Sequence, residues 1–484
     1  MMSHFLNRKA VFYDRFRTGD LMARATNDIN AVSEMAGYGI MVTMDSTVYL
    51  SFVIGMMFFT VSGKLTLISM LPIPILAYLL LILGKKVNTR YLASQDAFAD
   101  VNDDVLEGIE GVRVVRAYVQ ENTMAEKFKE KTNKVLEKNI SVAQINASFA
   151  PLIKILMGLS YVIAFSYGGR LVAQGELSVG KLVSFQVYLS MLVWPIQAVG
   201  ELINLVQQGS ASMTRISAVL TASDTMPKEG RQLLGKSRTI SFHAVSFQYP
   251  SSDFKNLRNL TLRIPTGSTL GIVGKTGSGK TTFIRQLLQQ YPNREGDLLI
   301  GDQRIEDIVP EKMTSLIGYV PQDSLLFSRS IFENIQFGNS SATPADVMQA
   351  IRYADFEKDL NQLPEGWDTK VGEQGVSLSG GQKQRLSIAR ALLKDPEYLI
   401  LDDSLSAVDA STEEQIIQNI EHLRKGKTTL IATHRLSAVY HAEWIIVLDN
   451  GEIIQEGTHD QLIQEKGWYA TQYTRQQLEG GRDE

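Results

Sequence analysis

The 484-residue chain contains no cysteine and only six histidines. The absence of cysteine excludes disulfide bonds, thiolate zinc sites and a cysteine nucleophile, so a metal ion would be held by oxygen or imidazole ligands. The chain also lacks an excess of positive charge, because 48 Lys and Arg residues stand against 52 Asp and Glu residues. This balance gives no indication of a protein that binds nucleic acid by neutralising phosphates.

Charged residues are missing from four long stretches, 46–63, 65–84, 155–169 and 182–200. About 20 residues of α-helix cover the roughly 30 Å hydrocarbon core of a bilayer. Buried helices of a soluble protein are the alternative, but such helices usually carry charged residues on one face. The sequence therefore predicts four transmembrane helices, at about 46–63, 65–84, 149–173 and 182–203.

Positive charge gathers on one side of these spans. Many Lys and Arg residues lie in 85–154 and in the N-terminal stretch, whereas Lys64 alone separates the first two spans. Loops rich in Lys and Arg remain in the cytoplasm. We therefore expect a multi-pass membrane protein with both termini in the cytoplasm.

The composition changes after the fourth span. Residues 222–238 are polar and contain proline and glycine, which predicts a linker. Beyond them, short apolar runs alternate with helical patterns, as is typical of an α/β domain with a parallel sheet. We expect a membrane domain at 1–221, the linker at 222–238, a soluble α/β domain at 239–476 and a tail at 477–484.

A phosphate-binding motif opens the soluble domain. The segment 274–281 fits the pattern G-x-x-x-x-G-K-[ST] and lies between an apolar strand pattern and a helical one. In this motif the glycines let backbone N–H groups surround phosphate oxygens, the lysine reaches the outer phosphates and the hydroxyl ligates Mg²⁺. The sequence predicts a nucleoside triphosphate site formed by Gly274, Lys275, Thr276, Gly277, Ser278, Gly279, Lys280, Thr281 and Thr282.

Two more patterns follow along the chain. The apolar run 398–401 ends at Asp402, which is suited to hold Mg²⁺ at the edge of a sheet. Before it, Leu378-Ser379-Gly380-Gly381-Gln382 precedes a helical stretch. Ser379 is a favourable N-cap, and the two glycines allow an anion to approach the helix N-terminus.

These motifs, in this order, resemble those of ATP-binding-cassette (ABC) proteins, and the spans make the chain similar to a half-transporter of the exporter type. The resemblance implies that Tyr249 stacks on adenine and that His434 contacts the γ-phosphate. It also implies that Gln322 helps to sense Mg²⁺, which makes Thr281, Gln322 and Asp402 the expected metal-site residues. ATP and Mg²⁺ are the expected cofactors.

The resemblance also implies a second chain. In ABC dimers each ATP lies between the P-loop of one chain and the signature of the other, here Ser379, Gly380, Gly381 and Gln382. The segment 17–28 resembles the first cytoplasmic loop of exporters, and 111–118 resembles the second, whose coupling helix inserts into the partner's nucleotide domain. The alternative for both segments is a charged helix that extends a span into solvent.

The chain departs from the family in its number of spans. An exporter half has six spans, whereas this chain has four and begins inside what resembles the loop after the second span. We expect the first two spans to be missing, and four spans would leave the lateral wall of the translocation path open.

The second departure lies beside Asp402. The family usually has a glutamate at the next position, which polarises the attacking water, and this chain has Asp403. A side chain shorter by one methylene moves the carboxylate by about 1 Å, and such a misplacement can cost on the order of 10²-fold in rate. The expected catalytic residues are therefore Asp403, His434 and Gln322, in a site that binds ATP and hydrolyses it slowly. The alternative is that aspartate is tolerated there.

An intact signature with an impaired carboxylate resembles one subunit of the heterodimeric bacterial multidrug exporters of the BmrC type. Their Asp-Asp-Ser-Leu-Ser-Ala-Val-Asp run matches 402–409. The resemblance implies ATP-driven export of hydrophobic drugs or similar amphipathic compounds across the bacterial cytoplasmic membrane. The expected partners are a second half-transporter, membrane lipid and a hydrophobic small molecule, without nucleic acid. A lipid or peptide exporter is the alternative, and a non-transport ABC ATPase is a distant one.

Overall fold

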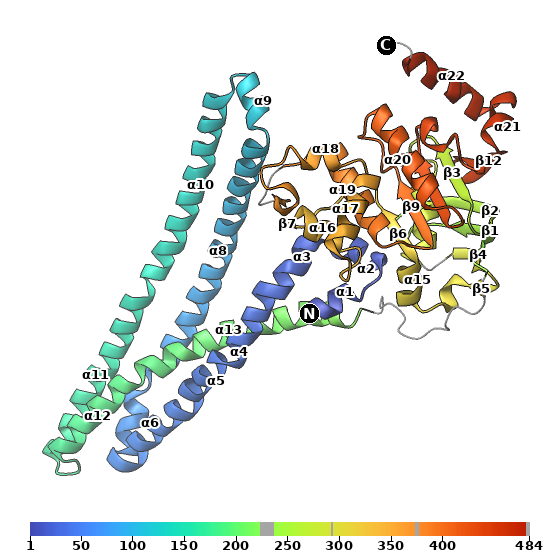
Figure 1. Ribbon diagram of the computed structural model, residues 1–484. Helices are drawn as coiled ribbons and strands as arrows, with labels where there is room; N and C mark the ends of the chain where they lie inside the picture. Colours follow the sequence, from blue (N-terminus) through green and yellow to red (C-terminus); the bar gives the residue numbers. More distant parts are fainter. Residues whose placement is uncertain (223–236, 292–293, 373–376, 481–484) are drawn as a thin grey trace. The chain divides into compact units, whose positions relative to one another are not determined.

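The computed structural model describes residues 1–222, 237–291, 294–372 and 377–480 (Figure 1). Most of the predicted linker, 222–238, and the end of the predicted tail, 481–484, therefore lie outside the described residues. The chain forms two compact units, one made of Gly19–Thr221 and the other of Met1–Thr18 with Ala222–Glu484.

The first unit is entirely helical and contains four helices long and apolar enough to cross a membrane, which confirms the predicted number of spans. They cover Thr18–Val61, Gly63–Glu110, Glu121–Ala173 and Val179–Leu220. The four helices, together with the short α9 between the second and the third, comprise α3 (Thr18–Ala23), η1 (Arg24–Asp28), α4 (Ile29–Ala36), α5 (Tyr38–Thr43), η2 (Met44–Tyr49), α6 (Leu50–Met56), η3 (Met57–Val61), α7 (Gly63–Ser69), α8 (Pro72–Glu110), α9 (Val112–Ala117), α10 (Glu121–Ala147), α11 (Phe149–Ala173), α12 (Val179–Met191) and α13 (Val193–Leu220).

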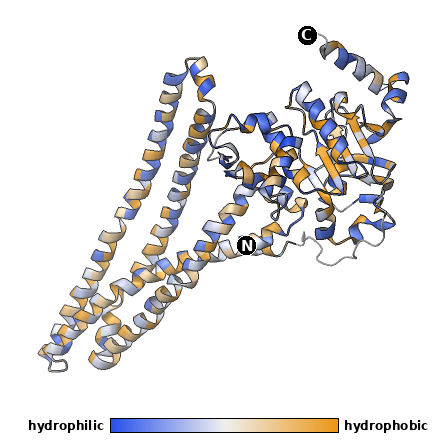
Figure 2. Ribbon diagram, in the orientation of Figure 1, coloured by the Kyte–Doolittle hydropathy of each residue, from blue (hydrophilic) through white to orange (hydrophobic). Residues whose placement is uncertain are grey.

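These helices are longer than the charge-free runs because they continue into charged sequence. Apolar residues colour the end of the unit that contains α6 and α12, and hydrophilic residues dominate toward α9 (Figure 2). In the charged part, α8 and α10 are joined by polar contacts, including the Asp104–Lys131 ion pair at 2.7 Å. The apolar part is held by buried side chains such as Leu65, Met157 and Phe185.

Two short helices begin the second unit, α1 (Met2–Leu6) and α2 (Ala10–Arg15). Phe12 on α2 is completely buried, and Ala10 and Val11 pack against a hydrophobic core of the α/β domain. The N-terminal stretch therefore packs with sequence that lies more than 200 residues downstream.

The rest of the second unit is the predicted α/β domain. Its main sheet has the order β12-β11-β3-β10-β9-β6, with parallel pairing throughout except between β11 and β12. These strands are β3 (Thr269–Gly274), β6 (Ile317–Val320), β9 (Tyr398–Asp402), β10 (Thr428–Thr433), β11 (Trp444–Asp449) and β12 (Glu452–Gly457). An antiparallel sheet of order β2-β1-β4-β5 contains β1 (Ile240–Phe247), β2 (Leu257–Ile264), β4 (Arg294–Ile300) and β5 (Gln303–Arg304).

Helices and a small two-stranded sheet complete this domain. They are α14 (Lys280–Leu287), η4 (Ile305–Asp307), α15 (Pro310–Leu316), β7 (Arg329–Ser330), α16 (Ile331–Gln336), α17 (Pro344–Tyr353), α18 (Glu357–Leu360), η5 (Gly366–Asp368), β8 (Lys370–Val371), α19 (Gly380–Leu393), α20 (Ala410–Leu423), η6 (Leu436–Val439), α21 (His459–Gln464) and α22 (Trp468–Gly480). The predicted fold, a domain of long apolar helices followed by an α/β domain with a mostly parallel sheet, is confirmed. The last helix, α22, continues into the stretch predicted as a tail.

Strand register brings the predicted motifs to one edge of the main sheet. Ala432 pairs with both Ile272 and Asp402, and Val320 pairs with Leu401. The segments after β3, β6, β9 and β10 therefore leave the sheet together, and these segments carry the P-loop, Gln322, Asp403 and His434.

Candidate nucleotide site

The P-loop connects β3 to α14 and depends on glycine at several positions. Gly274, Gly277 and Gly279 have φ angles of 151°, 82° and 109°, which L-residues rarely adopt. A Cβ on Gly274 would also lie 2.2 Å from the Leu448 carbonyl oxygen. The local chain therefore folds into a tight loop whose backbone N–H groups can surround an anion.

Lys280 lies over this loop. Its ammonium donates hydrogen bonds to the carbonyls of Gly274 at 2.8 Å and Lys275 at 3.0 Å. Burial lowers the pKa of Lys280, and the carboxylates of Asp403 and Asp402 act in the opposite direction. A positive charge is thus placed beside the loop, where the outer phosphates of a nucleotide would bind.

The side chains of Thr281 and Asp402 fit a magnesium site. The Thr281 hydroxyl donates a hydrogen bond to Asp402 Oδ1 at 3.0 Å, so the two predicted oxygen ligands converge. Burial raises the pKa of Asp402, and hydrogen bonds from Thr281 and Tyr319 partly offset this effect. Mg²⁺ prefers such hard oxygen donors and completes its coordination with phosphate and water.

Asp403 follows directly and is paired with His434. Its backbone has a φ of 48°, and its Oδ1 lies 2.8 Å from His434 Nδ1. A carboxylate oxygen at this distance can accept a hydrogen bond from an imidazole N–H. The structure therefore brings these two predicted catalytic residues together, with Asp403 turned toward the imidazole ring.

Gln322 is not brought into contact with this group. It lies two residues beyond β6, and its exposed side chain makes no hydrogen bond to any residue that the structure describes. Its predicted roles in catalysis and metal binding remain predictions.

Tyr249 lies at the end of the antiparallel sheet, beside α14. Its hydroxyl donates to Thr282 Oγ1 at 3.2 Å and accepts from Arg285 at 3.2 Å. The ring borders a cavity of about 390 Å³ that Phe247, Pro250 and Tyr291 also line.

The signature begins α19. Ser379 is the N-cap, and its hydroxyl accepts the Gln382 N–H while the Gln382 side chain accepts the Ser379 N–H at 2.9 Å. A Cβ on Gly381 would lie 2.6 Å from the Ala407 carbonyl oxygen, so only glycine fits that contact. The signature and the 406–409 loop are therefore packed together. The segment 371–375 resembles an exporter segment that touches the cytoplasmic loops, and residues 373–375 of it lie outside the described residues.

Sequence reasoning missed Tyr319 and Arg435. The Tyr319 hydroxyl donates to Asp402 Oδ2 at 3.3 Å. Arg435 donates to the carbonyls of Val408 at 2.9 Å and Ser406 at 3.0 Å, and forms an ion pair with Glu413 at 2.9 Å. The one sequence signal for Arg435 is its position directly after His434. The Tyr319–Asp402 contact gave no local signal, because it depends on the register of the sheet.

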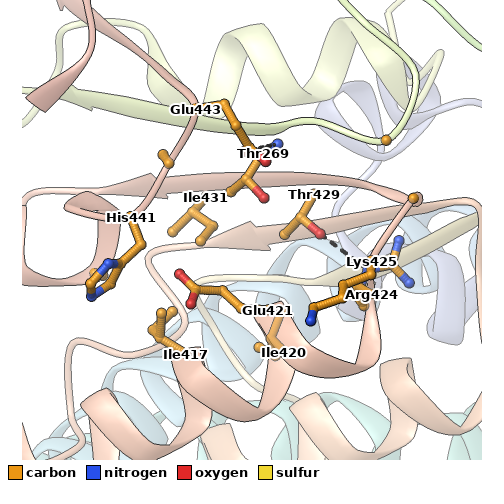
Figure 3. Close-up of a pocket in the computed structure, with 14 residues that line it drawn as sticks. Thr269, Ile417, Ile420, Glu421, Arg424, Lys425, Thr429, Ile431, His441 and Glu443 are labelled. Atoms are coloured by element: carbon orange, nitrogen blue, oxygen red, sulfur yellow. Dashed lines mark hydrogen bonds between the residues drawn. The ribbon is translucent and has the colours of Figure 1, made fainter.

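A second cavity, of about 470 Å³, lies at the opposite edge of the main sheet and contains none of the predicted site residues (Figure 3). Arg424 there donates to Thr429 and to the carbonyls of Pro396, Glu397 and Thr428, and burial lowers its pKa to about 10. Glu443 accepts the Thr269 N–H at 2.6 Å. These two side chains are occupied in tying strand ends together.

Comparisons with known proteins agree with this geometry. Residues 1–196 match the family described as "ABC transporter transmembrane region", and residues 257–406 match "ABC transporter". The chain is 51% identical to the probable multidrug resistance ABC transporter ATP-binding/permease protein YheI of Bacillus subtilis, over 99% of the chain and 83% of that protein. It is 40% identical to the multidrug resistance-like ATP-binding protein MdlA of Escherichia coli, over 98% of the chain and 80% of that protein.

A solved structure is similar to this chain over most of its length. The structure of a bacterial Atm1-family ABC exporter with ATP bound superposes with a TM-score of 0.84 and 25% sequence identity, covering 98% of this chain and 84% of that one. The transmembrane match is not expected of a non-transport ABC ATPase.

Proposed function

The chain belongs to the ABC transporters of the exporter type, and from this premise we propose that it exports hydrophobic drugs or similar amphipathic compounds as one half of a heterodimer. The family couples ATP hydrolysis to export, and the names of the two relatives support a multidrug transporter. We place the complex in the bacterial cytoplasmic membrane. The basic loops support a cytoplasmic position for both termini and for the nucleotide domain.

The nucleotide site would work through the residues described above. The P-loop and Lys280 bind the phosphates, while Thr281, Asp402 and Gln322 are the proposed metal-site residues. Mg²⁺, when bound, neutralises negative charge on the phosphates. Tyr249 is proposed to stack on the adenine.

The Asp403–His434 hydrogen bond is the observation that carries the proposal of a slow site. Hydrolysis requires a carboxylate that orients the attacking water, and positioning dominates this chemistry. In this chain the carboxylate is short and is already hydrogen-bonded to His434. Both features support a site that holds ATP and turns it over slowly.

The signature supports the heterodimer. The Ser379 N-cap and the close contact of Gly381 with Ala407 are both formed. This supports a signature that can complete the ATP site of another chain. Two copies of this chain would form two slow sites. A partner that has the glutamate would instead form one fast site with this chain's Ser379, Gly380 and Gly381.

Polar side chains on the apolar helices support an amphipathic substrate. Trp194 Nε1 donates to Asp45 Oδ2 at 3.2 Å. Carboxylates within apolar helices are rare and usually functional, and aromatic rings attract organic cations. A lipid or peptide exporter is the alternative function.

Transport into inside-out vesicles that contain the two-chain complex tests the function. We expect ATP-dependent accumulation of ethidium, an aromatic cation, and loss of most of it in Asp45→Asn. Movement of a labelled phospholipid or peptide without movement of ethidium would favour the alternative.

ATP binding at this chain's own site is tested separately. Lys280→Ala should abolish photolabelling by an azido-ATP analogue, because it removes the charge beside the P-loop. Lys312→Ala, which removes an exposed lysine on α15, is the matched control and should label normally. Undiminished labelling of Lys280→Ala would refute the site.

A further inference from the structure

We propose that Gln476, on the C-terminal helix α22, is a positioning residue for ATP binding and hydrolysis that fixes the loop carrying His434. The inference rests on the proposed contact of His434 with the γ-phosphate. It extends the nucleotide site to a helix that follows all of the sequence motifs along the chain.

Gln476 bridges the two sides of this loop with its side-chain amide. Its Nε2 donates to the His434 carbonyl at 2.8 Å, and its Oε1 accepts the Leu436 N–H at 2.9 Å. Because an amide side chain has both a donor and an acceptor, one residue binds two backbone groups that flank Arg435. The backbone on either side of Arg435 is therefore tied to α22.

The loop is short, so fixing its backbone also fixes the His434 side chain. It runs from the end of β10 at Thr433 to the start of η6 at Leu436, which is completely buried. The His434 side chain is half exposed, and its Nδ1 lies 2.8 Å from Asp403 Oδ1. Two hydrogen bonds to the backbone beside His434 restrain the direction of its Cα–Cβ bond, and with it the position of the imidazole ring.

Helix α22 is anchored so that it can hold this loop. Tyr469, Tyr473 and Gln476 lie at positions i, i+4 and i+7, which share one face of a helix. Tyr469 is completely buried, and its hydroxyl lies 2.7 Å from His459 Nδ1. The Tyr473 ring packs edge-to-face on Tyr440, directly after η6, with 5.8 Å between centroids. The helix therefore contacts the chain at both ends of η6.

The two nucleotides ATP and ADP separate this role from a purely structural one. ATP has a γ-phosphate and ADP does not, so a residue that positions His434 should affect the binding of ATP alone. A residue that only stabilises the domain would affect the binding of both nucleotides alike.

The test titrates photolabelling of this chain in the assembled complex with azido-ATP and with azido-ADP. We expect Gln476→Leu and Gln476→Glu to raise the half-saturating concentration of azido-ATP about 3- to 10-fold, the effect of losing one hydrogen bond. Neither variant should change the value for azido-ADP. Gln476→Glu keeps the size of the side chain, but its carboxylate cannot donate to the His434 carbonyl. Arg475→Ala, which removes an exposed side chain from the same helix, is the control and should change neither value.

A double variant shows whether Gln476 acts through His434. His434→Ala alone should weaken azido-ATP labelling, and the addition of Gln476→Leu should weaken it no further. Additive losses, equal losses for the two nucleotides, or no loss in Gln476→Leu would overturn the inference and leave the proposed function standing. If His434→Ala itself leaves azido-ATP labelling unchanged, the proposed γ-phosphate contact is wrong, and the inference falls with it.

Discussion

Asp403 is the residue whose substitution most directly tests the proposed asymmetry. Because its short carboxylate is held by His434, Asp403→Asn should lower the ATPase rate of the complex only slightly. Neutralising the partner's glutamate should lower the rate by about 10²-fold or more, as expected for loss of a general base. Steady-state ATPase measurements on the two single variants compare these losses.

Asp403→Glu provides the complementary measurement. The longer side chain restores the reach of the usual carboxylate, so it should raise turnover at this chain's own site. Equal losses from Asp403→Asn and from the partner's variant would instead mean two working sites.

Gly381 tests the signature at the same scale. Gly381→Ala places a Cβ 2.6 Å from the Ala407 carbonyl oxygen, so the start of α19 must shift. We expect the complex to lose most of its ATPase activity, while photolabelling of this chain's own P-loop continues. Gly380→Ala, whose Cβ would meet only the Ala407 side chain at 3.3 Å, should cost less. Equal effects of the two variants would contradict the contact.

Among the elements, η1 and α13 are joined by one buried charge. Asp28 accepts from Arg215 Nε at 2.9 Å and from the Ser212 hydroxyl at 2.9 Å. A surface ion pair contributes about 0–1 kcal/mol to stability, whereas breaking a buried pair costs about 3–5 kcal/mol. Because Arg215 is half exposed, we expect the cost of breaking this pair to lie between the two values. Asp28→Ala should destabilise the protein by about 2 kcal/mol, measured as a lower melting temperature in detergent. The double variant Asp28→Arg with Arg215→Asp should recover part of the lost stability. If its stability loss equals the sum of the losses of the two single variants, the ion pair is not the cause.

The N-terminus of α20 depends on Asp409. Its carboxylate accepts the Thr412 N–H at 3.0 Å and the Ser411 hydroxyl at 2.7 Å, and hydrogen bonds from these two residues lower the pKa of Asp409 to about 2. A lowered pKa stabilises the fold above the ordinary value of about 4, and the stabilisation disappears as the pH falls through about 2. Asp409→Ala should cost about 1 kcal/mol at neutral pH. The melting temperatures of the parent and Asp409→Ala should converge between pH 4 and pH 2. A difference that stays constant with pH would show that the ionised Asp409 carboxylate is not the source of the stabilisation.

At the scale of the whole molecule, Tyr118 is proposed to dock on the partner's nucleotide domain. It follows α9 and is 73% exposed, and Val119 beside it is 79% exposed. The nucleotide domain of this chain has exposed apolar side chains at Leu325, Phe327 and Phe337. The Arg390 guanidinium lies over the rings of the two phenylalanines. An equivalent surface on the partner would bury Tyr118.

Crosslinking tests this docking cleanly because the chain has no cysteine. A photoreactive reagent on Tyr118→Cys should crosslink to the partner's nucleotide domain. Glu176→Cys, in the loop between α11 and α12, is the control and should not reach it. Crosslinks from position 118 that form only within this chain would refute the crossing.

The sequence alone predicted the fold class and the four apolar helices correctly. Four charge-free runs indicated the spans, and the P-loop, the Asp402 strand and the signature indicated an ABC domain. These features can be predicted from the sequence because each depends on residues close together in the chain, through helix length, glycine conformation or an N-cap. The helices extend further than the charge-free runs because charged sequence continues the same helices beyond them.

Only the tertiary structure decided which distant groups meet. The Asp403–His434 pair and the Tyr319–Asp402 hydrogen bond depend on the register of β6, β9 and β10, which no local pattern specifies. The packing of Val11 and Asp14 beside Tyr249 and Tyr291 joins segments that lie more than 200 residues apart. Such contacts follow from how whole elements pack. Burial of apolar surface is favourable whichever part of the chain supplies it, so a local sequence pattern does not specify the partner. The sequence determined what kind of site this protein has, and the packing determined which side chains form it.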